Sequence, residues 1–145
     1  MTRNVSDPRT AKVISFFETL SPQSLSQLHE VYAQDAHFKD PFNEVQGIEA
    51  IHRVFEHMFD TLTGPRFAVQ QHMTQGNEAW LSWHFLIDRP EGSWTIRGAT
   101  YLQYDPSGRI KQHRDYWDPA EELYARLPIL GTLVRWLTRR LSASA

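Results

Sequence analysis

The feature of the sequence that most limits its fold is a change in hydrophobic periodicity at Arg66. Before this residue, apolar side chains recur at the three- and four-residue spacing of amphipathic helices, and after it they recur at every second residue. Four segments have the two-residue period of strands, namely residues 66–75, 78–88, 93–104 and 109–117. Their connections are short and carry turn residues, which predicts antiparallel neighbours. Helices followed by a curved antiparallel sheet predict an α+β domain with a cone-shaped pocket.

Helices are expected before and after the strands along the sequence. Three apolar stripes precede the sheet, with a short strand at residues 37–40 between the second stripe, which ends at Tyr32, and the third. Asp118 and Pro119 begin a C-terminal helical extension over residues 119–141, which Pro128 interrupts. We expect residues 1–145 to form a single domain, with a loose arm at residues 1–6.

The composition argues against several classes of protein. The 145 residues include no cysteine, which excludes disulfides and thiolate sites. The net charge of −2 does not indicate a nucleic-acid partner. The first ten residues lack the apolar run of a signal peptide, and no segment is long enough for stable membrane insertion, so we expect a cytoplasmic protein. Five Trp, five Tyr and eight Phe supply material for an apolar pocket.

The last predicted strand contains the stretch IKQHRDYWD, residues 110–118. Alternation places His113, Asp115 and Trp117 on one face of this strand. A strand face that only fills a core would carry Val, Ile or Leu. Titratable side chains beside a Trp therefore predict the wall of a pocket for a small apolar organic molecule.

A His–carboxylate pair is expected across the sheet. Counting residues from the turns places His84, Gly98 and Asp115 in one row on the same face of three strands. Gly98 would leave open space over which the other two side chains meet. Asp115 would then orient His84, and His84 would move a proton as a general base. The alternative is a buried pair that only tethers two strands, and a register shift of one residue would turn a strand's face.

Asp40 is the second expected acid or base, because it follows a short strand beside Phe38 and Phe42 in an apolar wall. Its alternative is a turn-forming role before Pro41. His113 is expected to bind a backbone carbonyl. A two-His, one-carboxylate iron site is a further alternative for these residues, and we expect no metal and no cofactor.

The order of these elements resembles the nuclear transport factor 2-like superfamily. Two stretches carry the resemblance, VYAQDAHFKDPF at residues 31–42 and GRIKQHRDYWD at residues 108–118, each leading to a helix. The resemblance covers nearly the whole chain and implies helices packed on a strongly curved, mixed and mainly antiparallel sheet. Because the superfamily mixes enzymes with non-enzymes, it implies no single activity.

Residue by residue, the chain is similar to two enzyme branches of this superfamily. Steroid delta-isomerases carry their base in an Asp-Pro like that at Asp40, while the positions of their oxyanion-hole Tyr and acid match Phe16 and Thr100. Limonene epoxide hydrolases carry a run similar to RDYWD, residues 114–118, which implies a catalytic role for Asp115. Their other site positions align with Ser82, His84, Phe38 and Asp40. SnoaL-like polyketide cyclases, which use an Asp or His in the cone, are a third comparison.

Together, these patterns predict a cofactor-independent acid–base enzyme, a hydrolase, isomerase or cyclase. The expected catalytic residues are Asp40, His84 and Asp115, and the expected pocket residues are Phe16, Phe38, Ser82, Gly98, Thr100, His113 and Trp117. The alternative is a non-catalytic ligand-binding or dimerisation module. The leucines of the last helix are expected to pack on the domain or to join a homodimer, and contact with a membrane surface is a third alternative.

Overall fold

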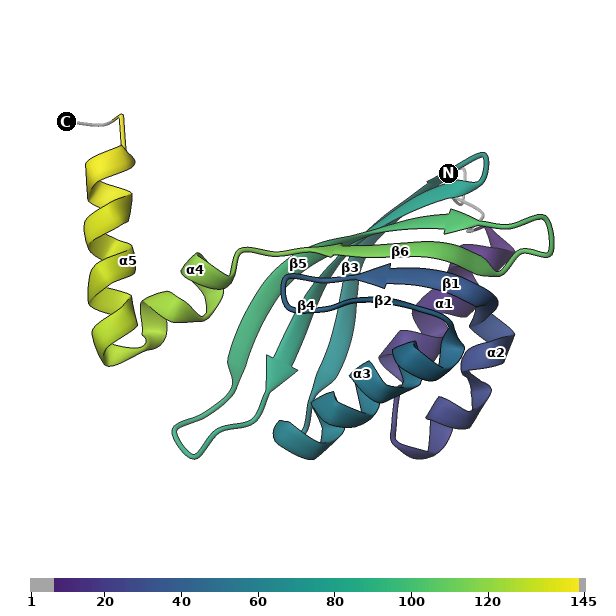
Figure 1. Ribbon diagram of the computed structural model, residues 1–145, viewed down its shortest axis with the longest axis horizontal. Helices are drawn as coiled ribbons and strands as arrows, with labels where there is room; N and C mark the ends of the chain where they lie inside the picture. Colours follow the sequence, from purple (N-terminus) through teal and green to yellow (C-terminus); the bar gives the residue numbers. More distant parts are fainter. Residues whose placement is uncertain (1–6, 144–145) are drawn as a thin grey trace, which may run out of the picture.

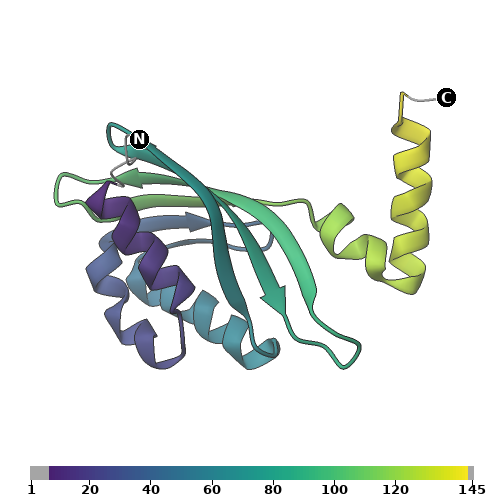
Figure 2. The same cartoon turned by 180° about the vertical axis from the view of Figure 1, so that it is seen from behind.

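A computed structural model of the protein describes residues 7–143, and the loose arm expected at residues 1–6 lies outside them. Helices α1, α2 and α3 cover one face of a curved, open sheet, and a helical segment at the C-terminal end extends beyond the sheet (Figures 1 and 2). This arrangement is the α+β cone that the sequence predicts.

The helices begin and end at recognisable signals. α1 (Pro8–Glu18) starts where the Asp7 side chain accepts a hydrogen bond from the Arg9 N–H, with proline in the first turn. The 3₁₀ helix η1 (Gln23–Gln27) and the short α2 (Leu28–Val31) follow, and α3 (Ile48–Thr61) starts after Gly47, which has a φ of 95°. The second predicted helix was extended too far, because the backbone is already extended at Tyr32.

One mixed sheet holds the strands of residues 7–143, in the order β2-β1-β6-β5-β4-β3. The strands are β1 (Tyr32–Lys39), β2 (Glu44–Gln46), β3 (Arg66–Gln75), β4 (Glu78–Ile87), β5 (Trp94–Tyr104) and β6 (Ile110–Tyr116). β1 runs parallel to β6, and the other neighbouring strands are antiparallel. The sequence missed β2, because three residues carry too little alternation to be recognised.

The register between β5 and β6 differs by two residues from the one counted along the chain. Thr100 pairs with Asp115 and not with His113. One residue of the shift arises at the turn, where Tyr104 pairs with Ile110 and not with Arg109, and the other at an irregularity between Gln103 and Tyr104. A shift of two residues leaves every side chain on its face, so His113 and Asp115 both point inward as predicted.

The register between β4 and β5 differs by one residue, and this has a larger effect. His84 pairs with Arg97, while Trp83 pairs with Gly98. Odd-numbered residues of β4 therefore face the helices and are buried, and His84 lies on the outer face. The predicted pair of His84 with Asp115 is wrong, since the two side chains are on opposite faces of the sheet.

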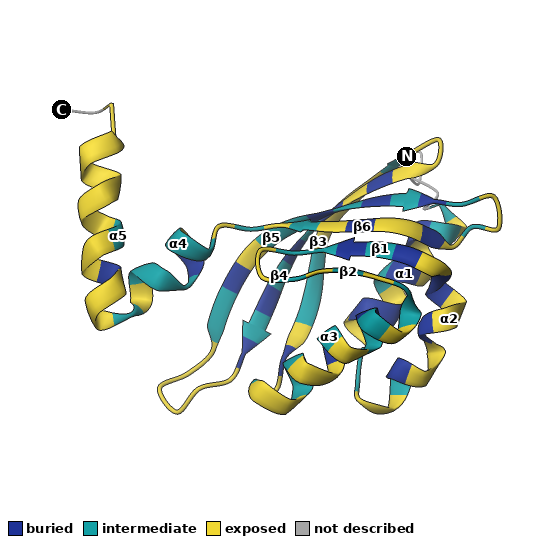
Figure 3. Ribbon diagram, viewed as in Figure 1, coloured by how far each residue is buried: buried dark blue, intermediate teal, exposed yellow. Residues whose placement is uncertain are grey.

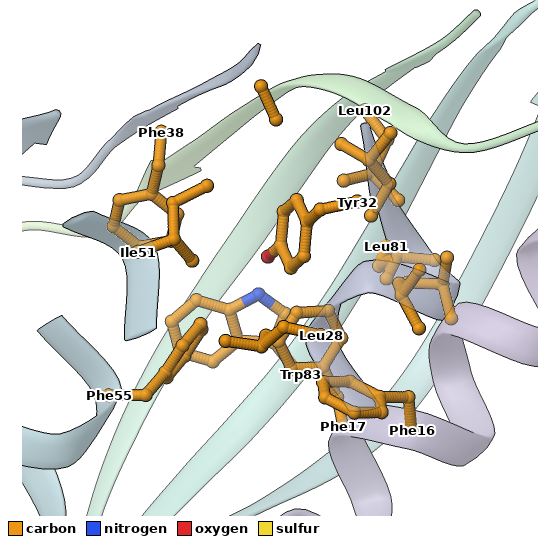
Figure 4. Close-up of a cluster of buried hydrophobic side chains, with 14 of the residues drawn as sticks. Phe16, Phe17, Leu28, Tyr32, Phe38, Ile51, Phe55, Leu81, Trp83 and Leu102 are labelled. Atoms are coloured by element: carbon orange, nitrogen blue, oxygen red, sulfur yellow. The ribbon is translucent and has the colours of Figure 1, made fainter. Parts of the chain in front are cut away.

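The core fills the space between the three helices and the inner face of the sheet (Figures 3 and 4). Aromatic rings dominate it, contributed by the helices and by β1, β4 and β5; they include Phe16, Phe17, Tyr32, Phe38, Phe55, Trp83 and Tyr104. Ring-to-ring contacts such as Phe17–Phe55 and Phe38–Phe55, with centroids 5.9 and 5.7 Å apart, join α1 and β1 to α3.

The chain leaves the sheet at Asp118, whose side chain accepts a hydrogen bond from the Ala120 N–H and begins α4 (Pro119–Glu122). The 3₁₀ helix η2 (Tyr124–Arg126) follows, and Leu127 adopts an extended backbone before α5 (Pro128–Leu141). None of the helices of residues 7–143 has both the length and the hydrophobicity needed to cross a lipid bilayer.

Candidate functional site

The site begins with Gly98, which makes room for the indole of Trp83. A Cβ atom at position 98 would lie 2.4 Å from the Cη2 ring atom of Trp83, far inside van der Waals contact. The expectation that Gly98 leaves open space is therefore wrong, because the indole of its neighbour on β4 fills that space. Lying against β5, the indole places its Nε1 atom 2.7 Å from Thr100 Oγ1.

A directed chain of hydrogen bonds then runs along the inner face of the sheet. The indole N–H of Trp83 can only donate, so Thr100 accepts from it. The Thr100 O–H donates in turn to Asp115 Oδ1, at 2.6 Å. His113 Nε2 lies 2.7 Å from the same oxygen. The actual partner of Asp115 is therefore His113, two residues away on β6, and the backbone carbonyl expected for His113 is replaced by side chains.

Tyr32 of β1 is the second hydrogen-bond partner of His113. Burial, with a smaller contribution from the charge of Asp115, raises the pKa of Tyr32 well above its ordinary value, so its hydroxyl stays protonated. That hydroxyl lies 2.7 Å from His113 Nδ1 and shares a buried hydrogen bond with it. A carboxylate only accepts hydrogen bonds, so Nε2, on the other side of the ring, donates to Asp115.

Aromatic rings surround the imidazole and fix its position. The centroids of Phe38 and Phe17 lie 4.6 and 5.6 Å from that of His113, and the side chain of His113 is only 3% exposed. Figure 4 shows the hydroxyl of Tyr32 and the indole nitrogen of Trp83 turned toward this interior region. Both ring nitrogens of His113 are engaged with protein, so its role is to hold Asp115.

Asp115 has an oxygen left for a ligand. In residues 7–143 nothing hydrogen bonds to its Oδ2 atom, and the side chain is 15% exposed. Asp115 lines both an inner cavity of about 20 Å³ and a larger pocket of about 430 Å³. Three aromatic residues, Phe55, Phe67 and Trp83, also line both spaces. The carboxylate is thus a polar group at the junction of two mainly apolar spaces, and a pocket of this size suits a small organic molecule.

The outer end of the larger pocket lies between the β1–β2 turn and the C-terminal segment. The ring of Trp117 packs edge-on against Phe42, with centroids 5.5 Å apart, and Leu123 completes this side. Asp40 also lines the pocket here. Its Oδ1 accepts hydrogen bonds from the backbone N–H groups of Phe42 and Asn43, at 2.8 and 2.6 Å, which is the turn-forming arrangement.

The structure places the other predicted site residues in three ways. Phe38 and Thr100 line the cone together with His113, Asp115 and Trp117. Phe16 lies in the core, and its neighbour Phe17 lines the inner cavity in its place. Ser82, like His84, is on the outer face of β4. Within residues 7–143, no three His, Cys, Asp or Glu side chains converge as metal ligands.

Two residues of the site were missed by reasoning from sequence. Tyr32 was assigned to the end of a helix, and Trp83 was treated as ordinary core. Trp83 could have been found, because the alternation of β4 places it with Leu81 and Phe85 on the apolar face. The contact between Tyr32 and His113 depends on parallel pairing of β1 with β6, for which the sequence has no local signal.

The fold and this cone define the class of protein, and comparison with known families agrees. The sequence profile of the SnoaL-like domain matches residues 13–113, and the chain belongs to this family, within the nuclear transport factor 2-like superfamily. No curated protein sequence matches the chain.

Solved structures with the same fold are distant in sequence. A nuclear transport factor 2-like protein of unknown function from Burkholderia pseudomallei has a TM-score of 0.70 at 16% identity, covering 80% of this chain and 95% of that one. A protein from Catenulispora acidiphila with a ketosteroid isomerase-like fold, in complex with trimethylamine, has a TM-score of 0.70 at 15% identity, covering 85% and 95%. TerC, co-crystallised with polyporic acid, has a TM-score of 0.69 at 14% identity, covering 79% and 95%.

Proposed function

We propose that the protein binds a small, mainly apolar organic molecule in the cone and that Asp115 acts on it as a general base. The observation that carries the proposal is the free Oδ2 of Asp115 at the junction of the two cavities. Thr100 and His113 hold the other oxygen, so the carboxylate is fixed before a ligand arrives. A positioned carboxylate of this kind can take a proton from the ligand or from a water molecule beside it.

The charge of the pocket restricts the ligand further. Among residues 7–143, the ionisable residues that line the larger pocket are Asp40, His57 and Asp115, and no lysine or arginine lines it. A ligand with a carboxylate or phosphate would meet negative charge without a counter-ion, at a cost that an apolar wall increases. We therefore propose a neutral or cationic ligand. The structures with trimethylamine and polyporic acid are consistent with a cone that accepts small organic molecules.

The reaction class follows from what the cone supplies. It offers one fixed carboxylate oxygen, while the donors Trp83, Thr100 and Tyr32 are used within the hydrogen-bond chain. Proton transfer by Asp115 without a cofactor is compatible with an isomerase, a hydrolase or a cyclase. Asp40 is a second carboxylate in the pocket lining, at its outer end, where both of its oxygens also accept hydrogen bonds within the β1–β2 turn.

The test begins with thermal unfolding in the presence of neutral, amine-bearing and acidic apolar compounds, because a ligand of the folded state raises the unfolding midpoint. Compounds that bind are then followed by NMR for turnover. Asp115→Asn keeps an oxygen that accepts from Thr100 and His113 but removes the base, so turnover should fall by about a hundredfold or more while binding persists. Unchanged turnover in Asp115→Asn would overturn the assignment.

His84→Ala is the matched control, since His84 is titratable and in the same sheet but on its outer face. It should leave both binding and turnover unchanged. If His84→Ala abolished turnover, the base would have to lie on the other face of the sheet.

A non-catalytic ligand-binding module is the second candidate. One observation favours it over the enzyme. Both ring nitrogens of His113 are hydrogen bonded to protein, so this histidine is not placed to return a proton to another part of the ligand. Binding with no turnover in wild type, and equal affinity in Asp115→Asn, would support it.

The exposed aromatic residues Trp80 and Tyr116 on the outer face are the surface we propose for a homodimer.

A further inference from the structure

The C-terminal helix α5 presents an apolar surface that no other part of the described chain covers. It stands away from the sheet, and its surface is almost entirely exposed (Figures 1, 2 and 3). Six large apolar side chains are exposed on it: Ile129, Leu130, Leu133, Trp136, Leu137 and Leu141. Ile129 is 86% exposed and Leu141 is 83% exposed, so neither end of the helix is covered. The expectation that these leucines pack on the domain is not met.

The opposite side of α5 is the one that attaches it to the rest of the protein. Gly131 is buried beside the Ala125 carbonyl, where a Cβ atom would lie only 2.6 Å from the oxygen. Arg135, one helical turn further on, donates to the same carbonyl at 2.7 Å. Because Gly131 and Arg135 share one helix face, the contact with η2 fixes which way the helix is turned. The apolar face is therefore held toward the outside.

The charge on the apolar face itself is positive. Residues 123–145 include four arginines and no acidic residue, whereas the rest of the chain has 11 Lys and Arg against 17 Asp and Glu. Arg140 lies at helical spacing within the apolar face, and its guanidinium stacks over the ring of Trp136 at 5.4 Å. Arg139 lies on the other side of the helix, where it lines a groove with Arg135, Asp118 and Glu121. An apolar helix face with Trp, Leu and only basic charges is typical of helices that lie in a membrane interface.

The alternative occupant, α5 of a second copy, fits this surface poorly. Two such helices would bring their arginines together without any acidic partner, and Arg140 would be enclosed by leucines. At a membrane, the same arginine reaches the headgroups along its aliphatic stem while Leu133 and Leu137 enter the acyl region. The charge pattern thus favours anionic lipid over a copy of the helix.

We propose that α5 binds the protein to the surface of membranes that contain anionic lipids. Ile129, Leu133, Trp136 and Leu137 enter the outer acyl region, and Arg140 contacts the headgroup phosphates. This proposal is independent of the function of the cone. It concerns where the protein lies and not what it binds or converts.

The experiment is co-sedimentation of the full chain with vesicles of phosphatidylcholine alone and with vesicles that also contain phosphatidylglycerol. Wild type should sediment with the anionic vesicles, less with neutral ones, and less again at high salt. Arg140→Gln should weaken binding about fivefold, and Leu133→Asp about tenfold or more. Arg139→Gln should have a smaller effect, because Arg139 lines the groove toward α4. Lys111→Gln and Met73→Asp are matched controls, because Lys111 and the 70% exposed Met73 lie on strands away from α5.

Each control variant removes the same kind of group elsewhere and should leave binding unchanged. Thermal unfolding of every variant checks that the fold is intact. Two results would overturn the proposal. One is equal sedimentation with neutral and anionic vesicles, and the other is no sedimentation together with a dimer in solution that Leu133→Asp converts to a monomer.

Discussion

Tyr32 and His113 are 81 residues apart in the sequence, yet the Tyr32 hydroxyl lies 2.7 Å from His113 Nδ1. The contact joins β1 to β6, the one parallel pair in the described sheet. It fixes the position of the His113 ring, and through it the orientation of the Asp115 carboxylate. The position of a candidate catalytic oxygen thus depends on a residue that does not itself line the cone.

Tyr32→Phe tests this contact at neutral pH. The substitution keeps the ring but leaves His113 Nδ1 buried without its hydrogen-bond partner, so the free energy of unfolding should fall by about 1–3 kcal/mol. Urea denaturation measures the change. Tyr101→Phe, which removes an exposed hydroxyl bonded to Glu78, is the control and should cost less. Equal effects of the two substitutions would mean that the buried bond has no special weight.

The same residue predicts how stability changes at alkaline pH. Burial and the charge of Asp115 raise the pKa of Tyr32 above its ordinary value of 10.0, so the unfolded chain loses this proton first. The contribution is complete below pH 10 and is lost above it, with a slope of up to about 1.4 kcal/mol per pH unit. In Tyr32→Phe, stability should decline less steeply above pH 10. Tyr101 and Tyr104, whose pKa values are also raised, remain in both proteins.

Gly98→Ala tests the contact between Gly98 and Trp83. The added methyl group would lie 2.4 Å from the indole, which must move and give up its bond to Thr100. We expect a loss of about 1–3 kcal/mol in the free energy of unfolding, measured by chemical denaturation. In a Trp83→Leu background the same substitution should cost little, because the clashing ring is absent. Additive effects in this double-mutant cycle would contradict the assigned contact.

Much of the fold could be predicted from the sequence because local patterns determine where its helices and strands begin and end. β3 occupies the residues predicted for it, and β4, β5 and β6 lie within a residue or so of their predicted ends. Asp118 begins the helix expected of it. The period of apolar residues and the residue types of turns are local properties of the sequence. They can therefore be recognised without knowledge of the tertiary structure.

The site was harder to predict because it depends on register. The strand face carrying His113 and Asp115 was identified, but the count across β4 and β5 missed by one residue and exchanged Trp83 for His84. The sequence of a turn does not determine which residues of the two flanking strands pair with each other. An irregularity in the pairing, such as the one at Gln103, also leaves no mark on the alternation of apolar residues. The helix α5 illustrates a different limit, since an apolar stripe does not indicate what covers it.

Thr100→Val examines the middle of the hydrogen-bond chain. Valine has nearly the shape of threonine but leaves the Trp83 N–H without an acceptor and removes one donor from Asp115. The buried N–H should lower the free energy of unfolding by about 1–3 kcal/mol. Thr95→Val on the same strand, whose side chain has no hydrogen bond to any of residues 7–143, should change it by less than about 0.5 kcal/mol. An equal loss of stability in Thr95→Val and Thr100→Val would mean that the effect comes from placing valine in this strand and not from breaking the hydrogen bonds of Thr100.

The charge of the pocket gives the last prediction, which concerns ligand choice. Pairs of compounds that share one apolar body, but end in an amine, a neutral group or a carboxylate, should differ in how far they raise the unfolding midpoint. Because Asp40 and Asp115 line the pocket without a lysine or arginine, the amine and neutral compounds should bind and the carboxylate should not. Asp115→Asn should narrow the difference between amine and carboxylate. Preferential binding of the carboxylate by wild type would mean that the ligand occupies another part of the molecule.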